Sequence, residues 1–179
     1  DELGIRHYEL GMRGAFERAV VQEFLTEYAS GRTPNPCVTC NRLIKFGPFL
    51  EKAAALGATH LATGHHAVVT RDESTGSCFL RKGRDRSKDQ SYFLYVLTQR
   101  ELSHVLMQIG GMTKTEVRGA ARTAGLSIAE RPESQDVCFV PDGDIAAFFR
   151  LMRPEAMRPG PIEDLEGNVL GEHGGIALY

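Results

Sequence analysis

The sequence predicts an α/β protein with a mostly parallel sheet, followed by the start of a small β-rich region. Short apolar segments typical of strands alternate with amphipathic helical segments over residues 1–143. This order is typical of parallel sheets whose strands are joined by helices. Beyond residue 153, prolines and glycines interrupt the chain and β-like runs follow. We therefore expect a domain boundary near Gly143, with residues 144–179 opening a second domain.

In the first third of the chain, the pattern predicts a strand at residues 7–10 and helices at residues 16–28 and 41–56. The second helix ends at Gly57, a common C-terminal stop. In the first helix, apolar side chains recur at four-residue steps and so share one face. They are Phe16, Val20, Phe24 and Tyr28.

Further along, short strands and helices alternate. The expected elements are a strand at 59–63, a hairpin of 67–70 with 78–81, helices at 89–97 and 113–124, a loop or strand at 134–140, and a helix at 144–153. Thr113 and Glu116 form a capping-box pattern, which fixes the start of their helix. Ligands of parallel sheets lie beyond the carboxyl ends of the strands. Gly64 and His65, just past the strand at 59–63, therefore stand where a ligand is expected.

Composition and charge exclude some classes of protein. Hydrophobic residues make up 42% and charged residues 25% of the chain, the balance of a globular protein. No run approaches the ~18 apolar residues of a membrane span, so we expect a cytoplasmic protein with no membrane partner. Residues 31–122 carry fourteen basic and seven acidic side chains, between two acidic flanks. A basic centre fits phosphate binding, and a solvated face explains the charge equally well.

Four cysteines carry the strongest chemical signal: Cys37, Cys40, Cys78 and Cys138. Cys37 and Cys40 form a C-x-x-C pair in a proline-stiffened loop immediately before a helix, whose N-terminus favours the thiolate. The residues alone leave open a redox or sulfur-handling pair, half a zinc site and part of an iron–sulfur site. No second C-x-x-C or paired-histidine motif completes a zinc site. Cys78, in the expected hairpin, reads as a packed apolar residue.

Four ordered segments resemble the bacterial-type tRNA 2-thiouridylases: GRTPNPCVTCNRLIKF at 31–46, ATGHHA at 62–67, KDQSYFLYVL at 88–97 and ESQDVCFV at 133–140. The resemblance spans nearly the whole chain. It implies a Rossmann-like adenine-nucleotide pyrophosphatase domain, of which residues 1–143 are the C-terminal part, followed by the start of a central domain at 144–179. The family's phosphate-binding glycine–serine loop and its C-terminal β-barrel would lie outside this piece, which alone is expected to be inactive.

The resemblance implies an enzyme that uses ATP, with Mg²⁺, to replace the C2 oxygen of a tRNA wobble uridine by sulfur. The partners implied are tRNA and a sulfur-donor protein, either a persulfide carrier or a cysteine desulfurase. By resemblance Cys138 carries the persulfide, Cys40 is its partner nucleophile, and we expect the two to come close enough to bond. Gly64 would contact ATP. The tRNA contacts implied are Asn35, Pro36, Cys37, His65, Lys88, Asp89 and Gln90.

One departure keeps rival hypotheses open. Many members of the resembled family have an aspartate where this chain has Cys37, so three cysteines could together hold an iron–sulfur cluster with one open iron position. They are Cys37, Cys40 and Cys138. The rivals are iron–sulfur-dependent thiolation, a non-catalytic redox module and a plain tRNA-binding fragment. The aromatic run 92–95 is expected in a helix core, with base stacking as its alternative.

Overall fold

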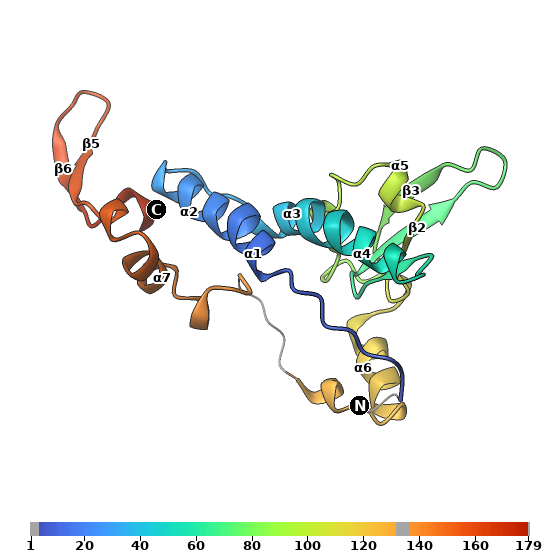
Figure 1. Ribbon diagram of the computed structural model, residues 1–179. Coiled ribbons are helices and arrows are strands. Elements are labelled where there is room, and N and C mark those ends of the chain that lie inside the picture. The colour runs from blue at the N-terminus through green and yellow to red at the C-terminus, as the bar shows by residue number, and fades with distance from the viewer. Residues whose placement is uncertain (1–3, 132–136, 179) are drawn as a thin grey trace. The chain divides into compact units, whose positions relative to one another are not determined.

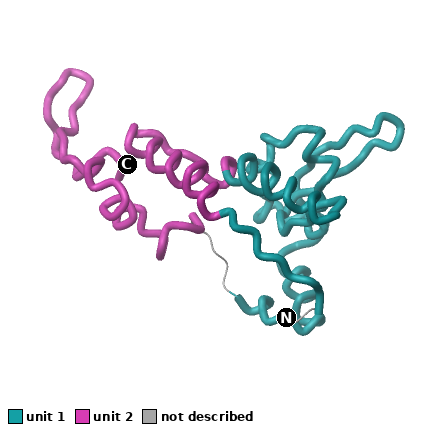
Figure 2. Tube along the Cα trace, viewed as in Figure 1, with its two compact units in different colours: residues 1–12, 40–133 teal, residues 13–39, 134–179 magenta. Residues whose placement is uncertain are grey.

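The computed structural model describes residues 4–131 and 137–178 (Figure 1). The chain forms two compact units, each assembled from two separate segments (Figure 2). Unit 1 contains residues 1–12 and 40–133, and unit 2 contains residues 13–39 and 134–179. No helix within the described ranges is both long and apolar enough to cross a membrane. The boundary expected near Gly143 stays a prediction.

Unit 1 contains the parallel strand pair of the α/β class. Strand β1 (Leu61–Ala62) pairs in parallel with β4 (Val105–Leu106), with Leu61 opposite Val105. The remaining elements of the unit are η2 (Asn41–Phe49), α4 (Leu50–Ala55), the antiparallel hairpin of β2 (Ala67–Arg71) and β3 (Cys78–Lys82), η3 (Ser91–Phe93), α5 (Gln99–Leu102), α6 (Lys114–Thr123) and η4 (Ser127–Glu130). Helices therefore precede both parallel strands, as the α/β class requires.

The core of unit 1 joins elements that are distant in the sequence. Its buried members are Phe46, Ala67, Leu94, Val105 and Met107. They come from the helical run, the hairpin, the segment after η3, and β4 with the residue that follows it. Because close packing leaves little freedom to shift, this core fixes the connecting segments 63–66 and 83–93 between its members.

The helical run that carries the C-x-x-C pair begins earlier than the sequence pattern indicated. Helix α3 spans Pro36–Cys40 and continues into η2, which is π-helical, and then into α4. Both cysteines therefore lie in the helix and not before it. Proline is favoured at a helix start because its missing N–H would find no intrahelical acceptor there. Gly47 has non-helical dihedral angles (φ −102°, ψ −112°) and Pro48 follows, which kinks the run.

Unit 2 is mostly helical. The run of α1 (Arg13–Phe16), η1 (Glu17–Val21) and α2 (Gln22–Ala29) confirms the expected first helix. The other elements are η5 (Pro141–Gly143), α7 (Ile145–Met152), η6 (Pro154–Ala156), the antiparallel hairpin of β5 (Gly160–Glu163) and β6 (Val169–His173), and η7 (Ile176–Leu178). Asp144 caps α7, since its Oδ1 accepts from the Ala147 backbone N–H at 2.8 Å. The unit's core comprises Val21, Phe24, Leu25, Val140, Phe149 and Ala177.

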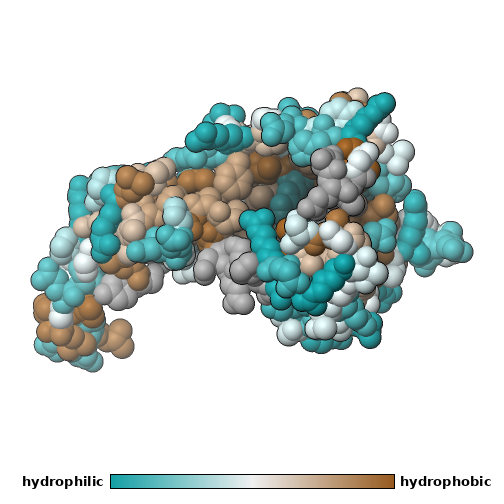
Figure 3. Space-filling model, turned by 90° about the horizontal axis from the view of Figure 1, so that it is seen from below, coloured by the Kyte–Doolittle hydropathy of each residue, from teal (hydrophilic) through white to brown (hydrophobic). Residues whose placement is uncertain are grey.

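Apolar side chains are exposed on the β5–β6 hairpin, which lies at one end of unit 2 (Figure 3). The most exposed are Leu165, Val169 and Leu170. The sequence predicts β-like runs after residue 153, and the structure has strands β5 and β6 there, paired as a hairpin.

Two expected elements, the strand at 7–10 and the helix at 89–97, are wrong, whereas the described part of the loop or strand expected at 134–140 is a loop. Residues 7–10 form no strand, and residues 137–140 form a turn; residues 134–136 lie outside the described part of the chain. The helix expected at 89–97 is only the short η3, because the side chains of Asp89 and Gln90 bind backbone groups elsewhere in the fold and not in a helix. Tyr92 and Tyr95 are consequently 58% and 72% exposed.

Candidate functional site

Gly64 lies two residues after the end of β1, at the carboxyl end of the parallel pair. A Cβ added there would meet no atom within 4 Å, and its φ lies outside the left-handed region. Neither packing nor backbone conformation in the described residues therefore demands glycine at this position. The missing side chain leaves room for a ligand to approach the backbone at the edge where such ligands bind.

His65 follows and is buried, with 8% of its surface exposed. Its Nδ1 lies 2.9 Å from Thr63 Oγ1, and its ring centroid lies 6.0 Å from that of Phe46 in η2. Burial first, and the positive charge of Lys45 second, lower the pKa of His65 to about 4. The ring is therefore neutral near pH 7, and it offers a ligand a hydrogen bond but no positive charge.

Gln90 is fastened to the residue after His65 by two hydrogen bonds. The His66 backbone N–H donates to Gln90 Oε1 at 3.0 Å, and the Gln90 backbone N–H donates to the His66 carbonyl at 2.9 Å. Because the amide oxygen serves the backbone, a ligand contact by Gln90 would use its Nε2 donors. The loop after β3, which contains Gly83, also lies close to the loop after β1, because a Cβ added to Gly83 would lie 2.6 Å from the His66 carbonyl oxygen.

Asp89 stabilises the loop of residues 83–91 through hydrogen bonds to other residues of that loop. Its Oδ1 accepts from the Gly83 backbone N–H at 2.7 Å, and its Oδ2 accepts from Ser91 Oγ at 2.8 Å. Burial acts to raise the pKa of this carboxyl, but the hydrogen bonds from Gly83 and Ser91 outweigh it and hold the pKa below its usual value. Asp89 is thus an ionised group that shapes the loop around Gln90.

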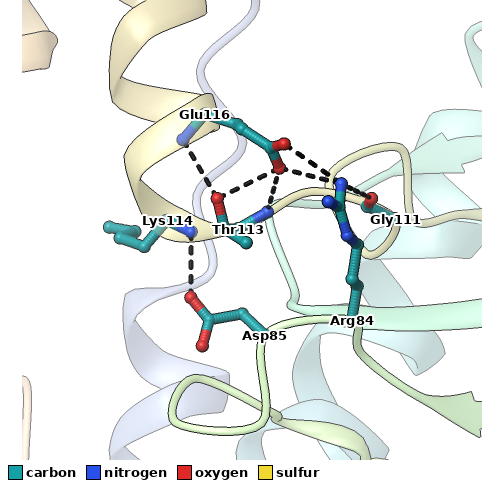
Figure 4. Close-up of polar contacts among 6 residues, drawn as sticks. All are labelled: Arg84, Asp85, Gly111, Thr113, Lys114 and Glu116. Atoms are coloured by element: carbon teal, nitrogen blue, oxygen red, sulfur yellow. Dashed lines mark hydrogen bonds and ion pairs between the residues drawn. The ribbon is translucent and has the colours of Figure 1, made fainter.

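The segment before Lys88 is tied to the start of α6 (Figure 4). Asp85 Oδ2 accepts from the Lys114 backbone N–H at 3.0 Å, and Arg84 Nη1 lies 3.1 Å from both carboxylate oxygens of Glu116. Glu116 also closes the expected capping box with Thr113. The exposed ion pair contributes little to stability, so the ordering of this loop rests on the Asp85 bond and on a second bond, from the Arg84 backbone N–H to the Gly110 carbonyl at 2.9 Å. Lys88 itself is half-buried.

Of the C-x-x-C loop, Asn35 and Cys37 are exposed, Pro36 is buried and Cys40 is half-buried. In helix α3 the three-residue spacing puts Cys37 and Cys40 on one helix face. The next residue, Asn41, is buried and its Nδ2 donates to the Phe93 carbonyl at 3.2 Å. Asn41 is not among the residues that the motifs predict for the site; its only sequence signal is a polar residue on the buried face of an amphipathic helix.

Cys138 is exposed in the turn 137–140 of unit 2, between two residues that pack on the unit's core, Val137 and Phe139. The Phe139 ring meets Phe16 and Phe24 edge to face, at centroid distances of 5.6 and 5.2 Å. Cys40 belongs to unit 1 and Cys138 to unit 2, so their close approach stays a prediction.

Cys78 is buried in the β2–β3 hairpin, which confirms its expected packing role. Gln99 brackets it, with Oε1 accepting from the Cys78 N–H and Nε2 donating to its carbonyl. Within residues 4–131 and 137–178, no three His, Cys, Asp or Glu side chains are grouped so that they could hold a metal ion. Cys40 belongs to one unit and Cys37 and Cys138 to the other, so a cluster held by all three stays a hypothesis.

Unit 1 also contains a cavity of about 390 Å³, away from this edge. Its lining includes Arg42, Phe46, Leu50, Leu97, Arg100 and His104. Thr59 and His104, which also line it, precede β1 and β4. The cavity thus lies at the amino ends of the strands, opposite to Gly64 and His65.

Comparison with known proteins gives the family. The model of the family described as "tRNA methyl transferase HUP domain" matches residues 1–142. The chain is 47% identical to the tRNA-specific 2-thiouridylase MnmA of Heliobacterium modesticaldum over 179 residues, which are 99% of this chain and 46% of the relative. It is 49% identical to MnmA 1 of Caldanaerobacter subterraneus over 177 residues, 99% of this chain and 49% of that relative. The chain spans about half the length of the curated relatives it matches. Its Rossmann-like α/β fold and this match over most of its length establish that the chain belongs to the tRNA methyl transferase HUP domain family.

Proposed function

We propose that the protein containing this chain is a tRNA uridine 2-sulfurtransferase that uses ATP. One observation carries the proposal: Cys40, a half-buried thiol, directly precedes the π-helical segment η2, which packs against His65 and bonds to the segment after Gln90. A sulfur nucleophile is thereby held beside the strand end where ligands of this fold bind. The names of the two relatives, each a tRNA-specific 2-thiouridylase, support the same reaction.

The chemistry divides between the two substrates and two cysteines. The uracil C2 oxygen attacks the α-phosphorus of ATP, and diphosphate leaves, because a carbonyl oxygen is a poor leaving group until it carries a phosphate. The terminal sulfur of a Cys138 persulfide then attacks C2, and AMP leaves with the oxygen. The Cys40 thiolate attacks Cys138 Sγ, which breaks the bond between Cys138 Sγ and the sulfur that is now attached to C2 of the base. The products are 2-thiouridine and a Cys40–Cys138 disulfide, and external thiol must reduce that disulfide before the next cycle.

The other residues bind and orient. Gly64 admits the nucleotide, and neutral His65 contacts the tRNA by a hydrogen bond. Gln90 directs its amide nitrogen at the target base while Asp89 holds the loop, and Lys88 contacts phosphate. Asn35, Pro36 and Cys37 line the pocket for the base, which must leave its stack to be reached. Exposed Tyr92 or Tyr95 can stack on a neighbouring base.

Two partners complete the proposal: tRNA, and a donor protein that loads the exposed Cys138 thiol with sulfur. Mg²⁺ would accompany ATP at the phosphates. The region that starts at residue 144 is proposed to open a separate central domain.

Product analysis tests the reaction. The full-length protein, a tRNA transcript, ATP and a persulfide donor are incubated, and the digested nucleosides are identified by mass spectrometry. We expect 2-thiouridine from wild type and none from Cys40→Ser or Cys138→Ser, while Cys78→Ser retains activity. Because the matched family is named for methyl transfer, S-adenosylmethionine is supplied in a parallel reaction. A methylated uridine, or thiolation that survives Cys138→Ser, would refute the proposal.

A further inference from the structure

Asn41 occupies an unusual position for a polar residue. It is 1% exposed, and it directly follows Cys40 at the start of the π-helical segment. Its Nδ2 donates to the Phe93 carbonyl at 3.2 Å, a bond that joins residues 52 positions apart. Phe93 ends the short η3, three residues after Gln90. One side chain thus connects the helix of the Cys40 thiol to the segment of Gln90.

The same helical segment reaches the strand end one turn later. In a π-helix residues five apart are one hydrogen-bonded turn apart, and Phe46 follows Asn41 by five. Phe46 packs on His65, with ring centroids 6.0 Å apart, while Lys45 acts electrostatically on the same imidazole. The segment therefore meets the 90–93 segment through Asn41 and the carboxyl end of β1 through Phe46.

The Asn41 side chain also carries a cost. Its Oδ1 is buried and has no hydrogen-bond partner among the described residues. An unsatisfied buried acceptor destabilises a fold, and an apolar residue of similar size would avoid that penalty. Packing alone therefore does not account for asparagine at this position, whereas a directional bond from Nδ2 does.

We propose that Asn41 is a positioning residue for Cys40, holding this thiol in fixed register with Gln90 through its bond to the Phe93 carbonyl. The proposal rests on the function proposed above for its account of turnover. Its structural content, that Asn41 restrains the helix at Cys40, stands independently of the reaction. Without the bond, the start of the helix opens, Cys40 becomes more accessible, and sulfur attack loses its alignment.

The test compares Asn41→Ala with Ile44→Val in the full-length protein. Ile44 is also buried in this helical segment but contributes only packing. In Asn41→Ala we expect Cys40 to be alkylated by iodoacetamide about threefold faster or more, relative to Cys78 in the same sample. We expect kcat to fall roughly ten- to hundredfold, with KM for tRNA within about twofold, as misalignment of reacting groups predicts. Ile44→Val should leave both measurements near wild type.

A second variant covers the case in which Asn41→Ala does not fold. In Asn41→Asp a protonated carboxyl can still donate to the Phe93 carbonyl, whereas an ionised one cannot. The excess alkylation of Cys40 over wild type should therefore grow as pH rises. Wild-type alkylation and kcat in the folded variants, or a change confined to KM, would overturn the proposal. Absence of 2-thiouridine from wild type would refute the function instead and leave the alkylation result to decide on Asn41.

Discussion

Cys40 and Cys138, the two cysteines proposed for sulfur transfer, lie in contrasting surroundings. Near Cys40, polar groups bind at defined angles: Asn41 to the Phe93 carbonyl, and Gln90 to both backbone groups of His66. Near Cys138, the adjoining Phe139 ring packs on Phe16 and Phe24, a backbone bond from the Val140 N–H to the Val137 carbonyl closes the turn at 2.9 Å, and the thiol is exposed. Hydrogen bonds fix orientation, whereas aromatic packing fixes position and leaves the thiol open. The first suits a group that must align with a base, and the second suits a thiol that receives sulfur from a second protein.

The largest effect is expected where aromatic packing is removed. Phe139 and Phe148 both contact the Phe24 ring, but only Phe139 adjoins Cys138. Alanine at either position should lower the free energy of unfolding by about 2–4 kcal/mol. Only Phe139→Ala should also cut thiolation in the folded protein by tenfold or more. Urea unfolding and a turnover assay measure the two effects. Equal activity losses in the two variants would mean that Phe139 has no special role in placing Cys138.

A change in the free energy of unfolding of similar size is expected from pH, through His65 in the region around Cys40. The pKa of His65 is lowered from 6.5 to about 4 in the folded state, so between these values the unfolded chain binds a proton that the folded chain does not. Stability must therefore fall as pH drops from about 7 to about 4, by about 3 kcal/mol in total. His65→Gln removes this contribution, so its unfolding free energy should fall less over the same range. Parallel pH profiles for the two proteins would show that His65 is not held neutral.

The sequence predicts the structural features that depend on neighbouring residues, but not those that depend on contacts between residues distant in the chain. The helix at 16–28, the capping box of Thr113 and the hairpin of 67–70 with 78–81 follow from local patterns, and the structure confirms them. The helix expected at 89–97 fails because Asp89 and Gln90 bind backbone at Gly83 and His66, contacts that no local pattern reveals. Strand β4 has two residues, too few for a periodicity to appear.

The site shows the same limit. The strand-end rule predicts the location of Gly64 and His65, and the motifs select the cysteines, because both signals are contiguous. The neutral state of His65 depends on burial and on Lys45, which only the fold brings near. The bond from Asn41 to Phe93 spans 52 positions and has no sequence signature.

Substitutions of Gln90 should have smaller effects, and they should separate stability from turnover. Gln90→Met removes the acceptor of the buried His66 N–H, which should cost about 1–3 kcal/mol of stability and also reduce turnover. Gln90→Glu keeps the acceptor and loses the Nε2 donors, so stability should hold while turnover falls. Binding of tRNA should change less than threefold in either variant, roughly the effect of a peripheral contact. If Gln90→Glu turns over like wild type, Gln90 acts only as a clamp on the loop.

The smallest effect, and the one most dependent on conditions, is expected at Lys88. A lysine that contacts a phosphate releases a counterion, so Lys88→Ala should weaken tRNA binding at low salt and lose that difference as salt rises. The slope of log affinity against log salt should become shallower by roughly 0.7–0.9. Arg100→Ala is the matched control, because Arg100 is an equally charged, exposed residue beside the cavity at the opposite strand ends. His65→Gln should also keep the wild-type slope, since a neutral imidazole releases no counterion. A filter-binding titration in which Lys88→Ala matches wild type at low salt would remove Lys88 from the RNA interface, and an equal slope change in Arg100→Ala would mean that binding senses only net charge.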